Sequence, residues 1–168
     1  MKKIILFMIP LLSIYLINIK EYNISEDTIR YRVIANSNSL EDLLMKEKIV
    51  DELSGILFKE NQSIEQVNDT IYKNLNNIEQ RIKKVFINNN YNKKFNISYG
   101  LNKFPEKTFL GKKYKAGEYK SLVIEIGEAK GNNYFCILYP SLCIVDYHKN
   151  NKNNKYDLKI REIINNLF

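Results

Sequence analysis

The sequence has few of the residues that build metal centres and nucleophilic active sites. Its 168 residues include a single histidine and two cysteines. Two thiolates would need two further ligands to hold zinc, and His148 can supply one of them. A catalytic thiol needs a base within hydrogen-bond reach and a third group that orients this base. Because His148 stands beside an Asn- and Lys-rich run, where a solvated side chain is expected, the sequence predicts no metal, no cofactor and no enzymatic activity.

The sequence also lacks the one-sided positive charge that is typical of nucleic-acid-binding proteins. The formal net charge is +7, but Lys2, Lys3 and Lys20 carry three of these charges on the first twenty residues. The other 23 of the 26 basic residues are interleaved with the 19 acidic ones. Phosphate binding requires basic side chains gathered on one face. A nucleic-acid-binding domain is therefore only an alternative, and it predicts an affinity that falls steeply with salt.

The N-terminal segment is the one long apolar run. It begins with MKK and continues as IILFMIPLLSIYLINI, which is interrupted by Pro10, Ser13 and Asn18. Its roughly 14–16 apolar residues would form a helix of about 21–24 Å, which is shorter than the ~30 Å hydrocarbon core of a bilayer. This length favours a signal peptide, although the small residues of a cleavage site are missing. We expect residues 1–20 to direct export, as a signal peptide or a short uncleaved anchor, and residues 21–27 to be a spacer.

The start of the following region predicts a strand and two helices. Residues 28–36 alternate apolar and polar side chains, with Arg30 and Arg32 on the polar side, as in a half-buried strand. Serines at positions 39 and 63, each followed three residues later by Asp or Gln, have the spacing of capping boxes. The first helix should therefore begin at position 39 and end near position 58. The second should begin at position 63 and run for about two dozen residues with apolar side chains every three or four positions.

After the helices the apolar period changes to two, which indicates strands. Residues 95–99 alternate, and residues 118–127 and 134–140 form an antiparallel pair around a turn, before a short extended segment at 142–146. The predicted fold is α+β: an N-terminal strand, two amphipathic helices, and three or four mainly antiparallel strands in one sheet with the helices on one face. The domain should cover residues 28–146. The polar tail 147–168, with its weak amphipathic helix, should be a solvated connector.

The two cysteines lie seven positions apart in CILYPSLC, on either side of a Pro-Ser turn signal. In an exported chain such a pair predicts a disulfide between Cys136 and Cys143 that clasps a hairpin. The alternative class of function is an exported cell-envelope hydrolase that uses one of these thiols or Glu128. Glu125 and Glu128 could form an acid–base pair for glycoside hydrolysis, but Glu125 falls on the polar side of its strand.

A polar junction, residues 36–39 with the sequence Asn-Ser-Asn-Ser, connects the predicted first strand to the first helix. Asn and Ser side chains accept hydrogen bonds from the free N–H groups at a helix start, and Asn tolerates left-handed backbone. This favours a structural interpretation of the junction. The other interpretation is a recognition surface formed by Arg30, Arg32, Asn36 and the exposed start of the helix.

Two blocks of the sequence resemble a known family. The first is Arg32-Val33-Ile34-Ala35-Asn36-Ser37, and the second comprises Gly117-Glu118-Tyr119, Gly127 to Asn133, Cys136, and Pro140 to Asp146. Both the blocks and the distance between them along the chain resemble the stage II sporulation protein R family of endospore-forming Firmicutes. The resemblance covers about residues 28–146. Where that family usually has an aromatic pair, often with tryptophan, before the first cysteine, this chain has Tyr134-Phe135.

The resemblance implies a signalling protein rather than an enzyme. Members of the family are exported across the forespore membrane into the space between the two sporulation membranes. There they trigger a membrane-embedded aspartic protease of the mother cell to process the precursor of sigma factor E. We expect an exposed, polar partner-binding surface and no nucleic-acid partner, with membrane contact only through the N-terminal segment. The expected surface comprises Arg30, Arg32, Asn36, Ser37, Glu41, Asp42 and Leu44, with Glu128 and Lys130 of the second turn as another patch.

Overall fold

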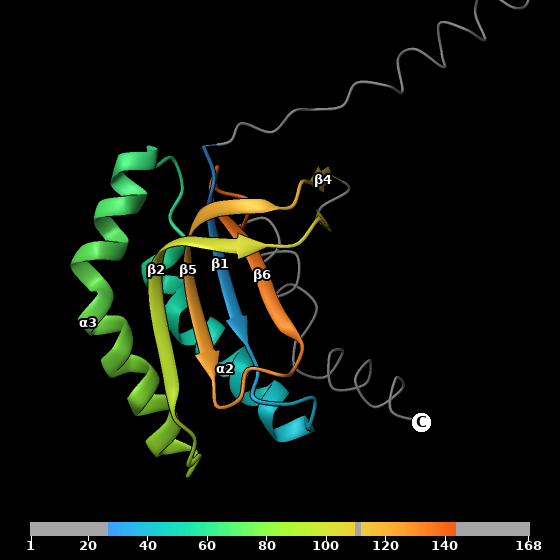
Figure 1. The fold of residues 1–168 in the computed structure, drawn as a ribbon. Coiled ribbons are helices and arrows are strands. Elements are labelled where there is room, and N and C mark those ends of the chain that lie inside the picture. Colours follow the sequence, from blue (N-terminus) through green and yellow to red (C-terminus); the bar gives the residue numbers. More distant parts are fainter. Residues whose placement is uncertain (1–26, 110–111, 144–168) are drawn as a thin grey trace, which may run out of the picture.

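The computed structural model describes residues 27–109 and 112–143, which fold into two helices and six strands (Figure 1). In chain order these are β1 (Ile29–Ile34), α2 (Leu40–Leu57), α3 (Ile64–Asn88), β2 (Phe95–Phe104), β3 (Lys107–Phe109), β4 (Lys112–Tyr114), β5 (Gly117–Ile126) and β6 (Asn133–Tyr139). The predicted α+β class is confirmed. The predicted export segment, spacer, final extended segment beyond residue 143, and C-terminal tail lie outside the described residues. Within the described ranges, neither helix is long and apolar enough to cross a membrane.

The four-stranded main sheet has the order β2-β5-β1-β6, and β3 and β4 form a separate two-stranded ribbon. Strand β1 lies parallel to β5, with Arg30 beside Ser121, and antiparallel to β6, with Arg32 beside Phe135. Strand β2 is antiparallel to β5 along ten residue pairs. Strand β1 therefore lies in the interior of the sheet, between β5 and β6. The predicted antiparallel pairing of residues 118–127 with residues 134–140 is wrong, because β1 separates these two strands.

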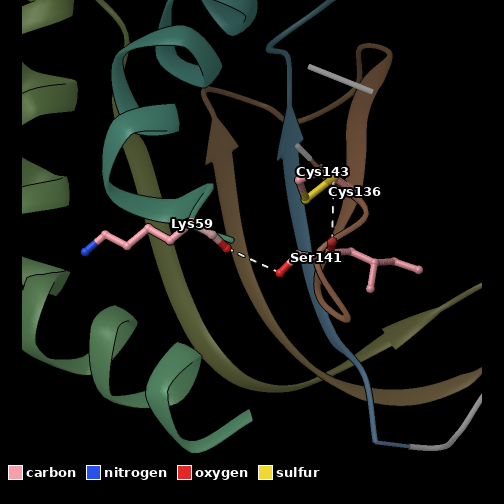
Figure 2. Close-up of a disulfide and its surroundings, with 5 residues drawn as sticks. Lys59, Cys136, Ser141 and Cys143 are labelled. Atoms are coloured by element: carbon pink, nitrogen blue, oxygen red, sulfur yellow. Dashed lines mark hydrogen bonds between the residues drawn. A yellow bond between two sulfur atoms is a disulfide. The ribbon is translucent and has the colours of Figure 1, made fainter. Parts of the chain in front are cut away.

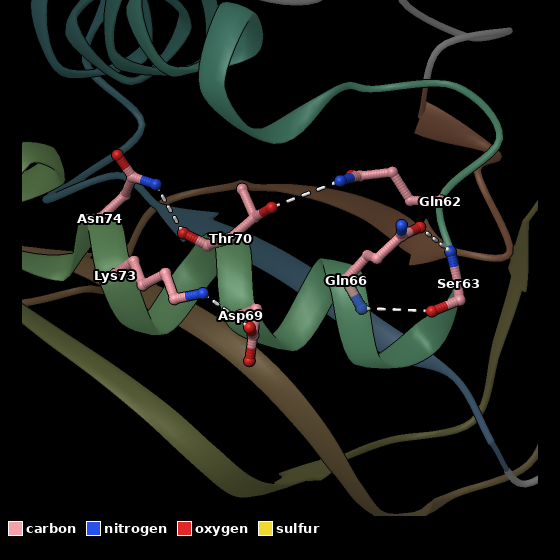
Figure 3. A network of polar contacts seen from close by, with 7 residues as sticks. All are labelled: Gln62, Ser63, Gln66, Asp69, Thr70, Lys73 and Asn74. Carbon is pink, nitrogen blue, oxygen red and sulfur yellow. Dashed lines mark hydrogen bonds and ion pairs between the residues drawn. The ribbon is translucent and has the colours of Figure 1, made fainter.

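Both helices begin at the serines that the sequence indicated. The hydroxyl of Ser63 accepts from the N–H of Gln66 (3.3 Å), and the Gln66 side chain accepts from the N–H of Ser63 (2.8 Å), which completes a capping box (Figure 3). At the first helix, Ser39 caps the N–H of Asp42 (3.2 Å). The N–H of Ser39, however, donates to the hydroxyl of Ser37 (3.1 Å). The predicted capping box is thus right for Ser39 and wrong for Asp42, whose carboxylate has other partners.

One face of the sheet packs against both helices and forms the main core. Tyr31 of β1 and Ile124 of β5 are fully buried there, together with Ile49 of α2 and Ile78 of α3. Burying an aliphatic side chain of this size stabilises the fold by roughly 1.5–3 kcal/mol. A smaller cluster lies apart from this core, and its members are Phe104, Tyr114, Val123, Phe135 and Ile137. The sheet therefore carries buried apolar side chains on both faces.

The predicted disulfide between Cys136 and Cys143 is present, and it joins β6 to the turn that follows this strand (Figure 2). Both cysteines are fully buried. The hydroxyl of Ser141 in this turn donates to the carbonyl oxygen of Lys59, just after α2 (3.3 Å). The turn is thus fixed both to the strand and to the connection between the helices. Because the two sulfur atoms are bonded to each other, neither is available as the nucleophile of a thiol hydrolase.

Candidate interaction site

The polar junction (residues 36–39) and the β5–β6 loop (residues 127–132) form one structural unit. The side-chain oxygen of Asn36 accepts from the N–H of Glu128 (3.0 Å), and that of Asn38 accepts from the N–H of Asn132 (2.7 Å). The N–H of Lys130 donates to the carbonyl oxygen of Asn36 (3.1 Å). Bonds from both ends of the junction to both ends of the loop hold the two segments together. The two sequence blocks that resemble the sporulation family therefore meet in space.

Two glycines allow this close approach. A Cβ atom at Gly131 would lie 2.1 Å from the carbonyl oxygen of Ser37, and one at Gly127 would lie 2.1 Å from the side-chain oxygen of Asn36. Gly127 also has a φ of 55°, a conformation that costs other residues more than glycine. The N–H of Gly131 completes the contact by donating to the carbonyl oxygen of Ala35 (2.9 Å). Larger residues at either position would separate the loop from the junction.

Asp42 lies at the centre of the polar junction, where only 5% of its surface is exposed. Its carboxylate accepts from the side chains of Asn36 (2.8 Å), Ser37 (2.5 Å) and Tyr91 (2.5 Å). Burial alone raises the pKa of Asp42, but the hydrogen bonds from Ser37, Tyr91, Asn36 and Ser39 outweigh it and lower the pKa from 3.8 to about 2. Our expectation that Asp42 is an exposed contact residue is therefore wrong, because it organises the junction from within.

The exposed rim of this unit carries charges of both signs. Glu128 and Lys130 form an ion pair at 2.7 Å with 69% and 75% of their side chains exposed. The Lys130 ammonium lowers the pKa of Glu128, whose carboxylate in turn raises the pKa of Lys130. Glu41 is also exposed, whereas Leu44 is half-buried. Such exposed pairs contribute little to stability, so these side chains can be changed without unfolding the protein.

Arg30 is not exposed as we had expected, because aromatic rings surround it. Its guanidinium carbon lies 3.2 Å from the ring centroid of Tyr119, and the rings of Phe104, Tyr114 and Phe135 lie at 5.0, 5.7 and 6.0 Å. Only 1% of the residue is exposed, and burial lowers the pKa of its guanidinium. Among the residues that the structure describes, the Nε and Nη1 atoms of Arg30 have no hydrogen-bond partner. Cation–π attraction to the rings compensates part of this desolvation, so Arg30 is a structural residue.

Arg32 lies on the same face of β1 as Arg30 and is half-buried. Its guanidinium carbon is 4.9 Å from the ring centroid of Phe104, and burial lowers its pKa while Glu125 acts in the opposite direction. Lys107 of β3 lies 4.8 Å from the ring centroid of Phe135, and burial followed by repulsion from Arg32 lowers its pKa. Of the two predicted arginine contacts, Arg32 is the one with a part of its surface accessible.

The sequence did not single out Asn38, Asn132 or Tyr91 as parts of the site. Asn38 and Asn132 lie within or beside the quoted blocks, but their contact joins segments that are 94 positions apart. In the sequence, Gly127 and Gly131 were the one local sign that the β5–β6 loop lies close to the polar junction. For Tyr91, which follows α3, the sequence offered no such signal.

Comparison with known proteins points to the family that the two sequence blocks resemble. The family model described as Stage II sporulation protein R matches residues 25–149, which include the polar junction and the β5–β6 loop. The Stage II sporulation protein R of Bacillus subtilis (strain 168) is 31% identical over 127 residues, which cover 74% of this chain and 57% of that protein. The chain thus spans less than two thirds of the length of this relative. No solved structure matches. The matched region accounts for most of the sequence and for the whole candidate site, and the chain belongs to the stage II sporulation protein R family.

Proposed function

We propose that this protein is an exported signal that activates a membrane-embedded aspartic protease of the mother cell, which then processes the precursor of sigma factor E. Membership of the family establishes a role in sporulation. The observation that carries the finer proposal is that hydrogen bonds join the two family blocks in one unit with exposed charges on its rim. A signalling protein acts by binding its receptor, and binding favours side chains presented on a fixed base.

The contact surface that we propose is the rim of the junction–loop unit. Glu41 at the start of α2, with Glu128 and Lys130 of the β5–β6 loop, would meet the protease directly. Asn36, Ser37, Leu44 and Arg32 are half-buried and would contribute their accessible parts. Arg30 and Asp42 would act only by holding this surface in place.

The proposed location is the space between the forespore and mother-cell membranes. Support comes from the positively charged and apolar N-terminal run, which has the composition of an export signal. The Cys136–Cys143 disulfide is also what an oxidising, non-cytoplasmic compartment allows. Export would leave the protein either free in this space or attached through residues 1–20.

Deletion of the gene in its spore-forming host tests the function. We expect the unprocessed precursor of sigma factor E to accumulate on immunoblots, and a wild-type copy expressed in the forespore to restore processing. Normal processing in the deletion strain would refute the proposal.

Charge reversal tests the surface separately from the function. A strain carrying the double substitution Glu41→Lys with Glu128→Lys should accumulate the precursor, because both changes lie on the proposed rim. Glu60→Lys, on the exposed connection between the helices, is the control and should allow normal processing. Thermal melts of the purified variants must stay within a few degrees of wild type. Normal processing in the double variant would show that the rim is not the contact surface.

A further inference from the structure

We propose that the outer edge of β2, together with the groove between β2 and α3, binds an extended acidic segment of a partner protein as an additional β-strand. This assignment goes beyond the signalling function and does not depend on it. Among the described residues, the ten-residue strand β2 pairs with β5 alone and is the border strand of the main sheet. Figure 1 shows β2 at this border, with α3 running alongside. One side of the strand is therefore without a neighbouring strand of this sheet.

In its own sequence and pairing, β2 lacks the devices that usually protect a sheet border. Proteins block such edges with charged residues, proline, bulges or short strands. The sequence of β2, FNISYGLNKF, contains one charged residue and no proline, and its pairing with β5 has no register shift. The opposite border strand, β6, is shorter, has a register shift against β1 and ends in a turn held by the disulfide. The two borders thus differ, and β2 is the one suited to strand addition.

Apolar side chains line the groove beside this edge. Phe86 and Ile87 of α3 line it together with Phe95 and Ile97 of β2. The rings of Phe86 and Phe95 are in edge-to-face contact, with 5.4 Å between their centroids, and form its floor. Ile87 is 74% exposed, and Leu101 farther along β2 is 72% exposed. Alternate side chains of an added strand point to one face of the sheet, so every second residue of the partner would cover the exposed side chains of Ile87 and Leu101. Recognition of this kind combines main-chain hydrogen bonds with pockets for alternate side chains.

The charge around the groove favours an acidic partner. Lys93 and Lys94, just before β2, line the groove and form no ion pair within the described residues. The pKa of Glu128 is lowered mainly by its partner Lys130, and the charge of Lys93 adds weakly to this effect. Lys83 lines it too, but pairs with Glu79 at 2.6 Å. A surplus of positive charge remains at the entrance. A second copy of this chain would bring the same positive charge to the same place, whereas glutamate or aspartate side chains would neutralise it.

A peptide of alternating glutamate and valine, ten residues long and labelled with fluorescein, provides a direct test. It is titrated with the full-length chain in phosphatidylcholine nanodiscs, and binding is measured by fluorescence anisotropy. We expect saturable binding that weakens about tenfold or more when lysine replaces glutamate in the peptide. The same loss is expected when alternate peptide nitrogens are methylated, since they can then no longer donate hydrogen bonds to the edge. Absence of saturable binding, or equal binding of the methylated peptide, would overturn the proposal.

Protein variants locate the site. The pair Lys93→Glu with Lys94→Glu should weaken binding of the acidic peptide about tenfold or more. The pair Lys59→Glu with Lys115→Glu makes the same change of net charge at exposed positions outside this groove, and should change the affinity less than twofold. Equal losses in both pairs would overturn the proposal in favour of non-specific attraction. A dimer in sedimentation experiments without peptide, if abolished by Leu101→Lys, would overturn it by making a second copy the occupant.

Discussion

Replacing Asp42 by asparagine should remove the charge around which the polar junction is organised. The lowering of its pKa from 3.8 to about 2 corresponds to roughly 2 kcal/mol of preferential stabilisation of the carboxylate in the folded protein. The shape of the side chain hardly changes, but the amide of asparagine has a single acceptor atom for the donors of Asn36, Ser37 and Tyr91. We expect Asp42→Asn to lower the free energy of unfolding by about 2 kcal/mol near pH 6.

The pH dependence of this effect has a defined direction. The pKa of Asp42 is lower in the folded protein than in the unfolded chain, so its contribution is complete above about pH 4. It is lost as the pH falls through about 2, where the folded protein takes up the proton. The difference in stability between wild type and Asp42→Asn should therefore shrink to nearly zero between about pH 4 and pH 2.

Urea denaturation of the purified protein, followed by far-ultraviolet circular dichroism at pH 6, 4, 3 and 2, measures this difference. Asp69→Asn is the matched control, because Asp69 is exposed and pairs with Lys73 on the surface of α3. Its effect should stay within about 0.5 kcal/mol at every pH. The reasoning would be refuted by a difference for Asp42→Asn that is small at pH 6 or that persists unchanged at pH 2.

Three further sets of substitutions test the packing and the disulfide of the domain. Gly131→Ala should destabilise the protein by roughly 1–3 kcal/mol, because the new methyl group would press on the carbonyl oxygen of Ser37. Gly55→Ala, in open space on α2, should instead stabilise the protein by about 0.5–1 kcal/mol. If urea denaturation gave the two glycine variants the same change in stability, the junction geometry would be contradicted. Joint replacement of Cys136 and Cys143 by alanine should cost about 2.5 kcal/mol in the loop-entropy model. Dithiothreitol should lower the free energy of unfolding of the wild type but not that of the alanine variant. A wild-type stability that does not change with this reductant would count against the Cys136–Cys143 disulfide.

Local features of the sequence predicted the elements well because the interactions behind them are local. Ser39 and Ser63 cap helices within three residues of themselves, so the spacing of polar side chains was enough to place both starts. Alternation along β1 correctly placed Arg30 on the opposite side from Tyr31. The disulfide, too, joins positions only seven apart.

The surroundings of individual side chains could not be predicted in the same way. The rings that cover Arg30 come from β2, β4, β5 and β6, so no pattern within β1 could show that this arginine is buried. Asp42 had the right spacing for a capping box, but donors from Asn36, Ser37 and Tyr91 compete successfully for its carboxylate. The parallel pairing of β1 with β5 likewise depends on contacts between distant segments.

The interior position of β1 has a consequence for how the domain can form. Among the described strands, β1 is synthesised first and its neighbours β5 and β6 last. The bond between Asn36 and Glu128 alone joins residues 92 positions apart. Helices α2 and α3 can assemble early from local contacts, whereas pairing over such separations is slow because a long loop must close first. In a chain that stops before β6, strand β1 has only β5 as a neighbour. Both cysteines are then missing, so the disulfide cannot form. Only a chain that is complete through this strand can therefore display the finished junction.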